Sequence, residues 1–354
     1  HHELVTHALS LSKKVLILLG SAKTSPDIRN PFSPELREKM IRGSFPPDIQ
    51  HRLEFYGLRD FPYNETVWIT QVQNIVKNAK ENLIDLPENK DSMHNIELGK
   101  IKTALVGHFK DNTSYYLKHF PQWTFESFNK VSLSGRKYLS ASDIRDIYLK
   151  GEYSRPKLER ENWLLEYVPA PVCDYLEEFS KTELYKNLRR EYKYTQDYIQ
   201  DSKFVGLPFK PTFVTTDCVV SAHGHILVVK RGVNPGKGKL ALPGGFLEHS
   251  LTLKANALKE LKEETRINIP AVILEASIKD HKVFDYPERS LRGRTITHAF
   301  YLELNTKMED GLPNVRGGDD ASGAFWIPIS ELLEREDEMF EDHASIVKIC
   351  LGIG

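Results

Sequence analysis

The chain contains little cysteine, with only Cys173, Cys218 and Cys350 among its 354 residues. The three lie far apart and lack metal-ligand spacing, so we expect small core residues in a reducing compartment and not disulfide partners. An excess of charge is also missing, because 48 Lys and Arg nearly balance 49 Asp and Glu, for a net charge of −1. This balance argues against a general binder of nucleic acid or membrane surfaces, although it leaves room for a local basic pocket.

Long apolar runs, repeats and low-complexity segments are absent as well. The longest strongly apolar runs, such as Val15–Leu19, have the length of a strand, so we expect no membrane span. No basic, hydrophobic signal peptide opens the chain, and the cytoplasm is the expected location. The length suffices for two domains, each with its own core. The sequence allows a homo-oligomer but does not specify one.

The first half alternates short apolar strands with amphipathic helices, which predicts a parallel α/β sheet. Val15–Leu19 and Thr103–Val106 are the expected buried strands. Ser33-Pro34-Glu35 supplies a cap, a first-turn proline and an acid for a helix to about Arg42. Ser142-Asp143 predicts the start of another helix, which ends near Gly151.

The second half shows an α+β pattern. Phe213–Val220 and Ile226–Val229 predict paired strands around a His223-Gly224 turn, and further strands are expected near Val272–Lys279 and Thr295–Leu304. A charged stretch and a Gly206-Leu207-Pro208 break separate the halves. We therefore predict domains at 1–190 and 205–354, with the boundary between roughly 185 and 205.

Glu260, Glu263 and Glu264 follow the turn Leu242-Pro243-Gly244-Gly245 at helical spacings of three and four. This spacing places three carboxylates on one helix face, where they repel one another unless a cation lies between them. Mg²⁺ suits such a set because it binds a few carboxylates and keeps positions for water and phosphate. The opposite face, with Ala257, Leu258 and Leu261, should enter a core. An ordinary charged helix surface is the alternative.

With the residues around them, these glutamates resemble the Nudix box, matched here as Gly245-x5-Leu251-x7-Lys259-Glu260-Leu261-x-Glu263-Glu264-x-Arg266-Ile267. The resemblance implies a loop–helix–loop that binds a divalent metal and hydrolyses a nucleoside diphosphate linked to another group. The family pattern has glutamate at position 251, arginine at 259 and glycine at 266. Lys259 keeps the charge but lacks the planar fork that braces two carboxylates at once. Leu251 removes an acid from the metal cluster.

Polar residues in the first half lie where predicted strands give way to helices, the usual ligand edge of an open α/β sheet. Ser140, Ser142 and Arg145 combine hydroxyls and free backbone N–H groups at a helix N-terminus with a first-turn arginine, an arrangement suited to polyphosphate. Serine caps and solvated arginines are common, so this motif is weak by itself.

Together, several stretches of the first half resemble the nicotinamide mononucleotide (NMN) adenylyltransferases, in the branch fused to a C-terminal Nudix domain. The matching stretches are Asn30-Pro31-Phe32-Ser33 through Arg37, Val106-Gly107-His108-x-Lys110-Asp111 with Ser114-Tyr115-Tyr116, Phe120-Pro121-x-Trp123, and Ser140-x-Ser142-x-x-Arg145. In the second half, Val283-Phe284-Asp285-Tyr286-Pro287, Arg289-Ser290 and Arg292-Gly293-Arg294 also match. The resemblance covers nearly all of the chain.

The resemblance implies a fold and a reaction for the first half: a Rossmann-like nucleotidyltransferase sheet in which NMN attacks the α-phosphorus of ATP, giving NAD and pyrophosphate. Ser140, Ser142, Arg145 and Arg37 would bind ATP. Trp68 looks like the aromatic that stacks on the nicotinamide ring, with Asp60 and Asn64 of the same motif on the NMN side. A buried core tryptophan is the alternative for Trp68.

Family members open with a strand and a Gly-Arg-Phe-x-Pro-Phe-His-x-Gly-His turn whose histidines touch the ATP phosphates. His1-His2-Glu3 fits the end of that motif, so His1 would be its second histidine, a catalytic and ATP-binding residue. We therefore expect that the sequence is truncated within the motif, and that without the first strand it transfers poorly.

For the second half, the resemblance implies ADP-ribose pyrophosphatase activity, with AMP and ribose 5-phosphate as products. Mg²⁺ or Mn²⁺ on Glu260, Glu263 and Glu264 would activate the attacking water. Arg231, Arg292 and Arg294 are candidates to clamp the diphosphate, or are surface arginines.

Three alternatives remain open. One is a non-catalytic Nudix sensor of ADP-ribose or NAD that regulates the transferase, and another is a hydrolase of a different nucleoside diphosphate derivative. The third, a Nudix transcriptional regulator, needs a basic DNA-reading helix pair, which the charge and the α/β pattern disfavour.

Overall fold

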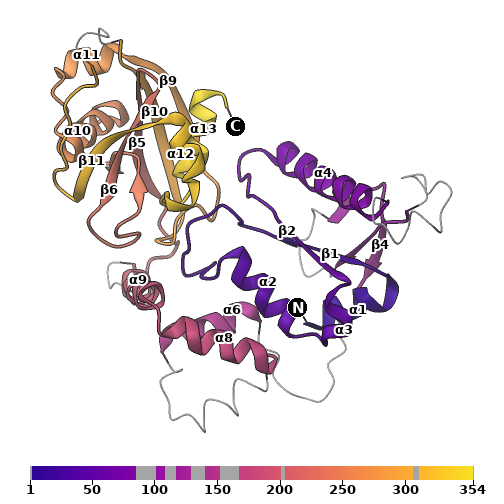
Figure 1. Ribbon diagram of the computed structural model, residues 1–354. Coiled ribbons are helices and arrows are strands. Elements are labelled where there is room, and N and C mark those ends of the chain that lie inside the picture. The colour runs from indigo at the N-terminus through magenta and orange to yellow at the C-terminus, as the bar shows by residue number, and fades with distance from the viewer. Residues whose placement is uncertain are drawn as a thin grey trace. The chain divides into compact units, whose positions relative to one another are not determined.

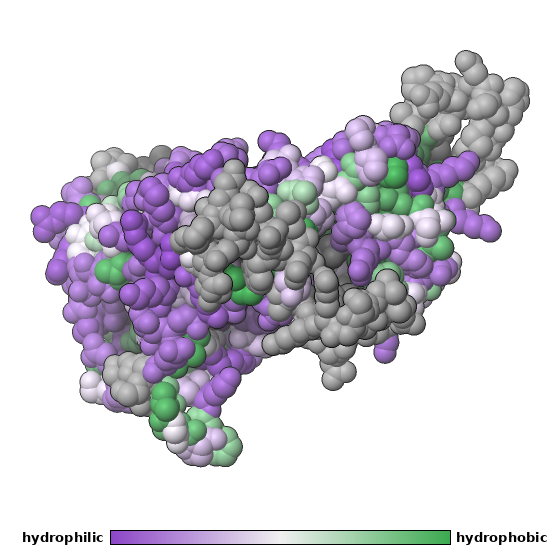
Figure 2. All heavy atoms as spheres, turned by 90° about the horizontal axis from the view of Figure 1, so that it is seen from below, coloured by the Kyte–Doolittle hydropathy of each residue, from purple (hydrophilic) through white to green (hydrophobic). Residues whose placement is uncertain are grey.

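The computed structural model describes residues 2–84, 101–107, 117–128, 140–151, 167–200, 204–305 and 311–353. The chain folds as two compact units (Figure 1). The first comprises residues 1–22 and 32–182, and the second comprises 23–31 and 183–354. None of the described helices is long and apolar enough to cross a membrane. The face seen in Figure 2 is mainly hydrophilic, and its hydrophobic residues form small separate groups.

The first unit contains two pairs of parallel strands in its described part. β1 (Val15–Leu19) pairs with β2 (Leu53–Gly57), and β3 (Ala104–Gly107) pairs with β4 (Thr124–Ser127). This confirms an α/β unit with parallel strands. Its described α-helices are α1 (His2–Leu11), α2 (Pro34–Gly43), α3 (Pro47–Gln50), α4 (Glu65–Ile84), α6 (Ala141–Lys150) and α8 (Ala170–Ser180).

Two helices of this unit begin at serine caps. The Ser33 hydroxyl accepts the Leu36 N–H at the start of α2, as the Ser-Pro-Glu signal predicts. Ser140 caps α6 in a reciprocal capping box with Asp143, so the expected start at Ser142-Asp143 is two residues late. Asp143 serves as the third helical residue of that box and not as a cap. Gly151 ends α6 in the left-handed conformation at φ 83°, as expected.

The second unit contains α9 (Glu183–Ile199) and a seven-stranded mixed sheet with the main order β11-β6-β5-β10-β9. β5 runs parallel to β10 and antiparallel to β6 across the His223-Gly224 turn. The strands are β5 (Phe213–Ala222), β6 (His225–Arg231), β7 (Leu240–Ala241), β8 (Gly244–Phe246), β9 (Ile278–Phe284), β10 (Thr295–Glu303) and β11 (Ala321–Pro328). The helices are α10 (Leu253–Thr265), α11 (Ala271–Ala276), α12 (Ile329–Glu334) and α13 (His343–Leu351), with a 3-10 turn at Glu336–Glu338.

The core of this sheet packs against α10. Ala257, Leu258 and Leu261 are buried in one cluster with Cys218 and Phe300, which confirms the predicted apolar face. The strand predicted at Val272–Lys279 is wrong, because Pro270 begins α11 there and β9 starts only at Ile278. Only Leu274 of that apolar run is buried, so its hydrophobicity does not mark a strand. The three cysteines are free, and Cys218 is buried.

Candidate functional site

The glutamate helix α10 and the Gly244-Gly245 turn of β8 are hydrogen-bonded to each other. The Gly244 N–H donates to the Glu264 carboxylate at 3.0 Å. Burial raises the pKa of Glu264 to about 8, and the charge of Glu260 adds to the rise while the Gly244 bond opposes it. A Cβ at Gly245 would lie 2.8 Å from the Glu260 Oε2, so glycine is what allows that carboxylate to reach the turn.

Asn256, which is fully buried, fixes the turn to the helix from the other side. Its amide donates to the Thr216 hydroxyl at 2.9 Å and to the Phe246 carbonyl at 3.2 Å, while its oxygen accepts the Glu248 N–H at 3.0 Å. Thr252 caps α10 by accepting the Ala255 N–H. The carboxylates therefore project from a helix whose position is set by buried polar contacts.

Lys259 and Arg266, which differ from the family pattern, both have structural roles. The single ammonium of Lys259 contacts Glu263 at 2.6 Å and Glu248 at 2.9 Å. Although lysine lacks the planar fork of arginine, its one nitrogen contacts two carboxylates here, because the two acids approach it from different segments. Arg266 ends α10 in the left-handed conformation, at φ 48°, where the family pattern has glycine.

The donor set of this helix fits a hard divalent cation. Besides burial, the neighbouring carboxylates Glu263, Asp319 and Glu248 raise the pKa of Glu260, so negative charge is crowded here. Carboxylate oxygen is the ligand type that Mg²⁺ and Mn²⁺ take. In the described residues, no three or more acidic, histidine or cysteine side chains are already arranged around one point. Of the three helix acids, Glu260 and Glu264 reach the glycine turn, whereas Glu263 is held by Lys259.

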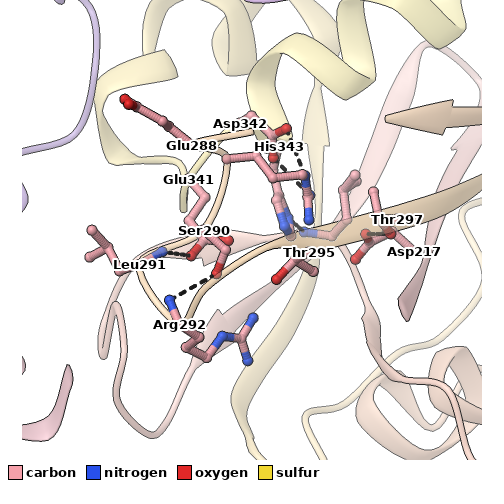
Figure 3. Close-up of polar contacts among 12 residues, drawn as sticks. Asp217, Glu288, Ser290, Leu291, Arg292, Thr295, Thr297, Glu341, Asp342 and His343 are labelled. Atoms are coloured by element: carbon pink, nitrogen blue, oxygen red, sulfur yellow. Dashed lines mark hydrogen bonds and ion pairs between the residues drawn. The ribbon is translucent and has the colours of Figure 1, made fainter. Parts of the chain in front are cut away.

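A small polar cavity of about 40 Å³ lies beside the glycine turn. Its lining includes Gly244 and Gly245 together with three arginines, Arg231, Arg289 and Arg292. Leu242 of the same turn also lines it, and the lining residues that sequence reasoning missed are Thr215, Asp217, Phe246, Phe340, Glu341 and His343. Figure 3 shows part of this wall, where the loop with Ser290 and Arg292 faces the Glu341–His343 segment.

Two of the cavity arginines oppose each other electrostatically. Burial, and next the charge of Arg292, lower the pKa of Arg231. Arg231 lies over the Phe340 ring at 4.2 Å and Arg292 over the Phe246 ring at 4.7 Å. The buried Arg292 Nε has no hydrogen-bond partner within the described structure. An anion with several oxygens would relieve this repulsion and satisfy that donor.

Arg289 is held differently, by two hydrogen bonds to the Asp342 carboxylate at 3.0 and 2.8 Å. Sequence reasoning noted Arg289-Ser290 as a matched motif but did not single out Arg289, and nothing in the sequence pairs it with Asp342, 53 residues later. Arg294, which we expected beside Arg292, is not among the residues that line the cavity. Its guanidinium donates to the Asp285 carbonyl and lies 3.8 Å from that residue's carboxylate.

His343 and Asp217 are buried polar groups in the cavity wall. The His343 Nδ1 accepts the Leu242 N–H at 2.9 Å, and burial lowers the pKa of this imidazole to about 3. Burial raises the pKa of Asp217, which accepts the Thr297 hydroxyl. Figure 3 shows the Asp217–Thr297 pair. The two hydrogen bonds, Leu242 to His343 and Thr297 to Asp217, therefore hold side chains that line the cavity.

In the first unit, the predicted phosphate site at the start of α6 contains the expected groups. Ser140 caps the helix, and the Arg145 guanidinium donates to the Ser142 hydroxyl at 3.0 Å. The helix N-terminus, two hydroxyls and one arginine are therefore side by side. His1 lies outside the described residues, as do the motif residues from His108 to Tyr116.

Arg37 and Asp60 lie close enough to interact near the end of β1. The Ser21 N–H donates to the Asp60 carboxylate at 3.2 Å. Burial lowers the pKa of Arg37, while the charge of Asp60 opposes that effect. The structure thus groups a predicted ATP residue with a predicted NMN residue at the carboxyl end of a strand.

Asn64 and Trp68 belong to the start of α4. The Asn64 side chain accepts the Val67 N–H at 3.2 Å, as a helix cap does. Trp68 is partly buried against Leu58, Val72 and Phe120. Its role in stacking on a ligand stays a prediction.

Comparisons with known proteins cover both units. Residues 211–348 match the NUDIX domain. A nicotinamide/nicotinic acid mononucleotide adenylyltransferase from Acinetobacter baylyi is 31% identical over 193 residues, 54% of this chain and 86% of that protein. An ADP-ribose pyrophosphatase from Methanocaldococcus jannaschii is 33% identical over 135 residues, 38% of this chain and 70% of that protein.

A solved structure matches nearly the whole chain. It is a bifunctional NMN adenylyltransferase/ADP ribose pyrophosphatase from Francisella tularensis, complexed with AMP and a manganese ion. The TM-score is 0.82 and the sequence identity 32%, over 99% of this chain and 94% of that one.

Proposed function

The chain belongs to the family of bifunctional NMN adenylyltransferases/ADP-ribose pyrophosphatases, and from this membership we propose that it carries out both reactions. In the first, ATP and NMN give NAD and pyrophosphate. In the second, water hydrolyses ADP-ribose to AMP and ribose 5-phosphate. We assign the transferase to residues 1–190 and the hydrolase to residues 205–354.

The observation that carries the hydrolase assignment is the cavity in which Arg231 and Arg292 repel each other beside the Gly244-Gly245 turn. Two half-buried guanidinium groups suit the two phosphates of a diphosphate. The Glu264 and Glu260 carboxylates reach the same turn. A diphosphate held by the arginines would therefore have the carboxylate helix at its side.

Glu260 and Glu264 would hold the divalent cation, Mg²⁺ or Mn²⁺, with Glu263 as a further ligand. When bound, the cation would lower the pKa of a water molecule and neutralise charge on the phosphates. The Gly244 N–H would keep Glu264 oriented, Lys259 would do so for Glu263, and Asn256 would keep the turn in place. Arg231 and Arg292 would hold the phosphates against the turn.

The transferase reaction needs alignment and charge neutralisation more than covalent help from the protein. Ser140, Ser142 and Arg145 would bind the ATP phosphates at the start of α6, with Arg37 as a further ATP ligand. Trp68, Asp60 and Asn64 would form the NMN side. His1 keeps its proposed role as a phosphate contact. The cytoplasmic location and the homo-oligomer stay predictions.

A panel of assays tests the proposal. The full-length protein is incubated separately with ATP plus NMN, ATP plus the nicotinic acid mononucleotide, and ADP-ribose, each with Mg²⁺ or Mn²⁺. We expect dinucleotide from at least one mononucleotide, and AMP from ADP-ribose only when metal is present. Calorimetric binding of ADP-ribose without turnover would show that the second unit is a sensor and not a hydrolase. Equal release of AMP with and without metal would contradict the role of the carboxylates as a metal site.

A further inference from the structure

The segment Lys23–Pro31 lies between β1 and α2 in the sequence, yet it packs as part of the second unit. Its shape is fixed internally by Asp27. The Asp27 carboxylate accepts the N–H groups of Arg29 at 2.8 Å and of Asn30 at 2.6 Å. Such a side-chain turn needs no regular secondary structure and presents Arg29 at a defined position.

Arg29 is hydrogen-bonded to the loop that carries two cavity arginines. Its guanidinium donates to the Glu288 carbonyl at 2.5 Å and to the Ser290 carbonyl at 3.3 Å, on either side of Arg289. Ser290 is buried, and its hydroxyl accepts the Arg292 N–H at 3.3 Å. Ser290 therefore links Arg29 to Arg292 through two hydrogen bonds. Figure 3 shows Glu288, Ser290 and Arg292 along this loop.

The same segment also contacts the loop that follows Arg231. The Lys239 ammonium donates to the Pro26 carbonyl at 2.8 Å. The Arg231 N–H in turn donates to the Lys239 carbonyl at 2.9 Å, which closes that loop. Arg231, the last residue of β6, and Arg292 are thus both next to a chain segment that Lys23–Pro31 contacts.

We propose that Arg29 is a positioning residue for the pyrophosphatase cavity, which fixes the Glu288–Arg292 loop so that Arg292 faces the diphosphate. This inference rests on the proposed hydrolysis of ADP-ribose. The guanidinium groups of Arg231 and Arg292 repel each other across the cavity, and the Arg29 hydrogen bonds hold the loop against this repulsion together with the Arg289–Asp342 pair. Arg29 itself does not line the cavity.

The test compares Arg29→Ala with Arg29→Lys and with Lys23→Ala, an exposed position in the same segment. We expect Arg29→Ala to lower kcat/KM for ADP-ribose about 10-fold, mainly through KM, because a displaced clamp binds phosphate less well. Lysine can donate to one carbonyl and should restore part of the loss. Lys23→Ala should match the wild type. Since Arg29 acts through Arg292, adding Arg29→Ala to Arg292→Ala should cost nothing further.

Hydrogen–deuterium exchange gives a readout that does not depend on turnover. Arg29→Ala should speed exchange at the Leu291 and Arg292 amides and leave α10 unchanged. If Arg29→Ala speeds exchange but the wild type hydrolyses no ADP-ribose, the proposed hydrolysis is refuted, whereas the role of Arg29 in positioning the loop is supported. An active wild type whose Arg29→Ala variant keeps both its KM and its exchange rates would overturn the inference, as would fully additive losses in the double variant.

Discussion

The candidate site of the second unit brings like charges together. In the first unit, by contrast, candidate residues cap the N-termini of helices. Arg231 and Arg292 share a cavity, where burial and then the charge of Arg292 lower the pKa of Arg231, and Glu264 is buried beside Glu260. In the first unit, Ser140 and Asn64 already cap helices.

The difference shows two ways of preparing a phosphate site. Crowded like charges cost stability until a counter-ion binds, so their arrangement points to a ligand. A capped helix N-terminus is stable without one, because its remaining N–H groups can face either water or phosphate. Electrostatics therefore mark the candidate hydrolase site, whereas the candidate transferase site is distinguished mainly by its residue types.

The largest effect should come from Glu264→Gln. This change keeps the shape and removes the charge, so we expect AMP release from ADP-ribose to fall about 100-fold or more, as when a metal site is disrupted. Stability should not fall, because a carboxyl with a pKa of about 8 is already largely protonated at neutral pH without metal. Metal-dependent product formation is the measurement, with the exposed Glu303→Gln as the control. Undiminished turnover in Glu264→Gln would refute the metal role.

Arg145→Ala should affect the transferase reaction, the formation of NAD from ATP and NMN. Loss of one charged hydrogen-bond donor to phosphate costs about 1.5–3 kcal/mol, or roughly 10- to 150-fold in kcat/KM for NAD formation. The variant is compared with Lys150→Ala, which lies at the far end of the same helix. Equal activity of the two variants would mean that this helix start does not bind ATP.

Comparing Arg292 with Arg294 tests whether the phosphate-binding arginines are those that line the cavity. Arg292→Ala should lower kcat/KM for ADP-ribose by about 10- to 100-fold, because it removes a phosphate donor. Arg294→Ala should cost only a few-fold, since its guanidinium is engaged by Asp285 outside the cavity lining. Steady-state kinetics of both variants decide this, and the reverse ranking would contradict the assignment of the clamp.

The buried imidazole of His343 makes stability depend on pH. Its folded-state pKa of about 3 is below the ordinary value of 6.5, so the unfolded chain binds a proton that the folded chain excludes. This group's contribution is therefore present above pH 6.5 and is lost as the pH falls toward 3, at about 1.4 kcal/mol per pH unit. Urea unfolding between pH 7 and pH 4 should show a shallower dependence for His343→Gln. The exposed His249→Gln should keep the wild-type slope.

The smallest effect concerns the end of α10. Arg266→Gly should stabilise the chain by about 0.5–1 kcal/mol, because glycine adopts the left-handed conformation without steric cost. Lys262→Gly, inside the same helix, should instead lose about 1 kcal/mol. Urea midpoints measure both. A loss at Arg266→Gly would mean that the packing of its side chain over Gly318 outweighs the backbone strain.

Local signals predicted the elements that carry the sites. Ser33-Pro34-Glu35 and Gly151 mark helix ends by short-range hydrogen bonding, and the apolar face of α10 follows from periodicity alone. The run at Val272–Lys279 misled because strand-forming side chains also occur in a short exposed helix, and Pro270 decided the outcome.

Contacts between distant segments could not be predicted. Nothing near Arg289 indicates Asp342 as its partner, and nothing in Lys23–Pro31 indicates that this segment packs with the second unit. Phe246 and Phe340 reach the cavity from elements 94 residues apart, so their cation–π contacts emerge only from the fold. Motif resemblance supplied the acids and some arginines, because those are contiguous in sequence.

The most direct test of two separate phosphate-handling sites is a crossed assay on three proteins: the wild type, Arg145→Ala and Glu264→Gln. Each is measured for NAD formation from ATP and NMN and for AMP release from ADP-ribose. The account predicts that Arg145→Ala loses only the first activity and Glu264→Gln only the second. Loss of both activities in either variant, or a wild type without AMP release, would contradict it.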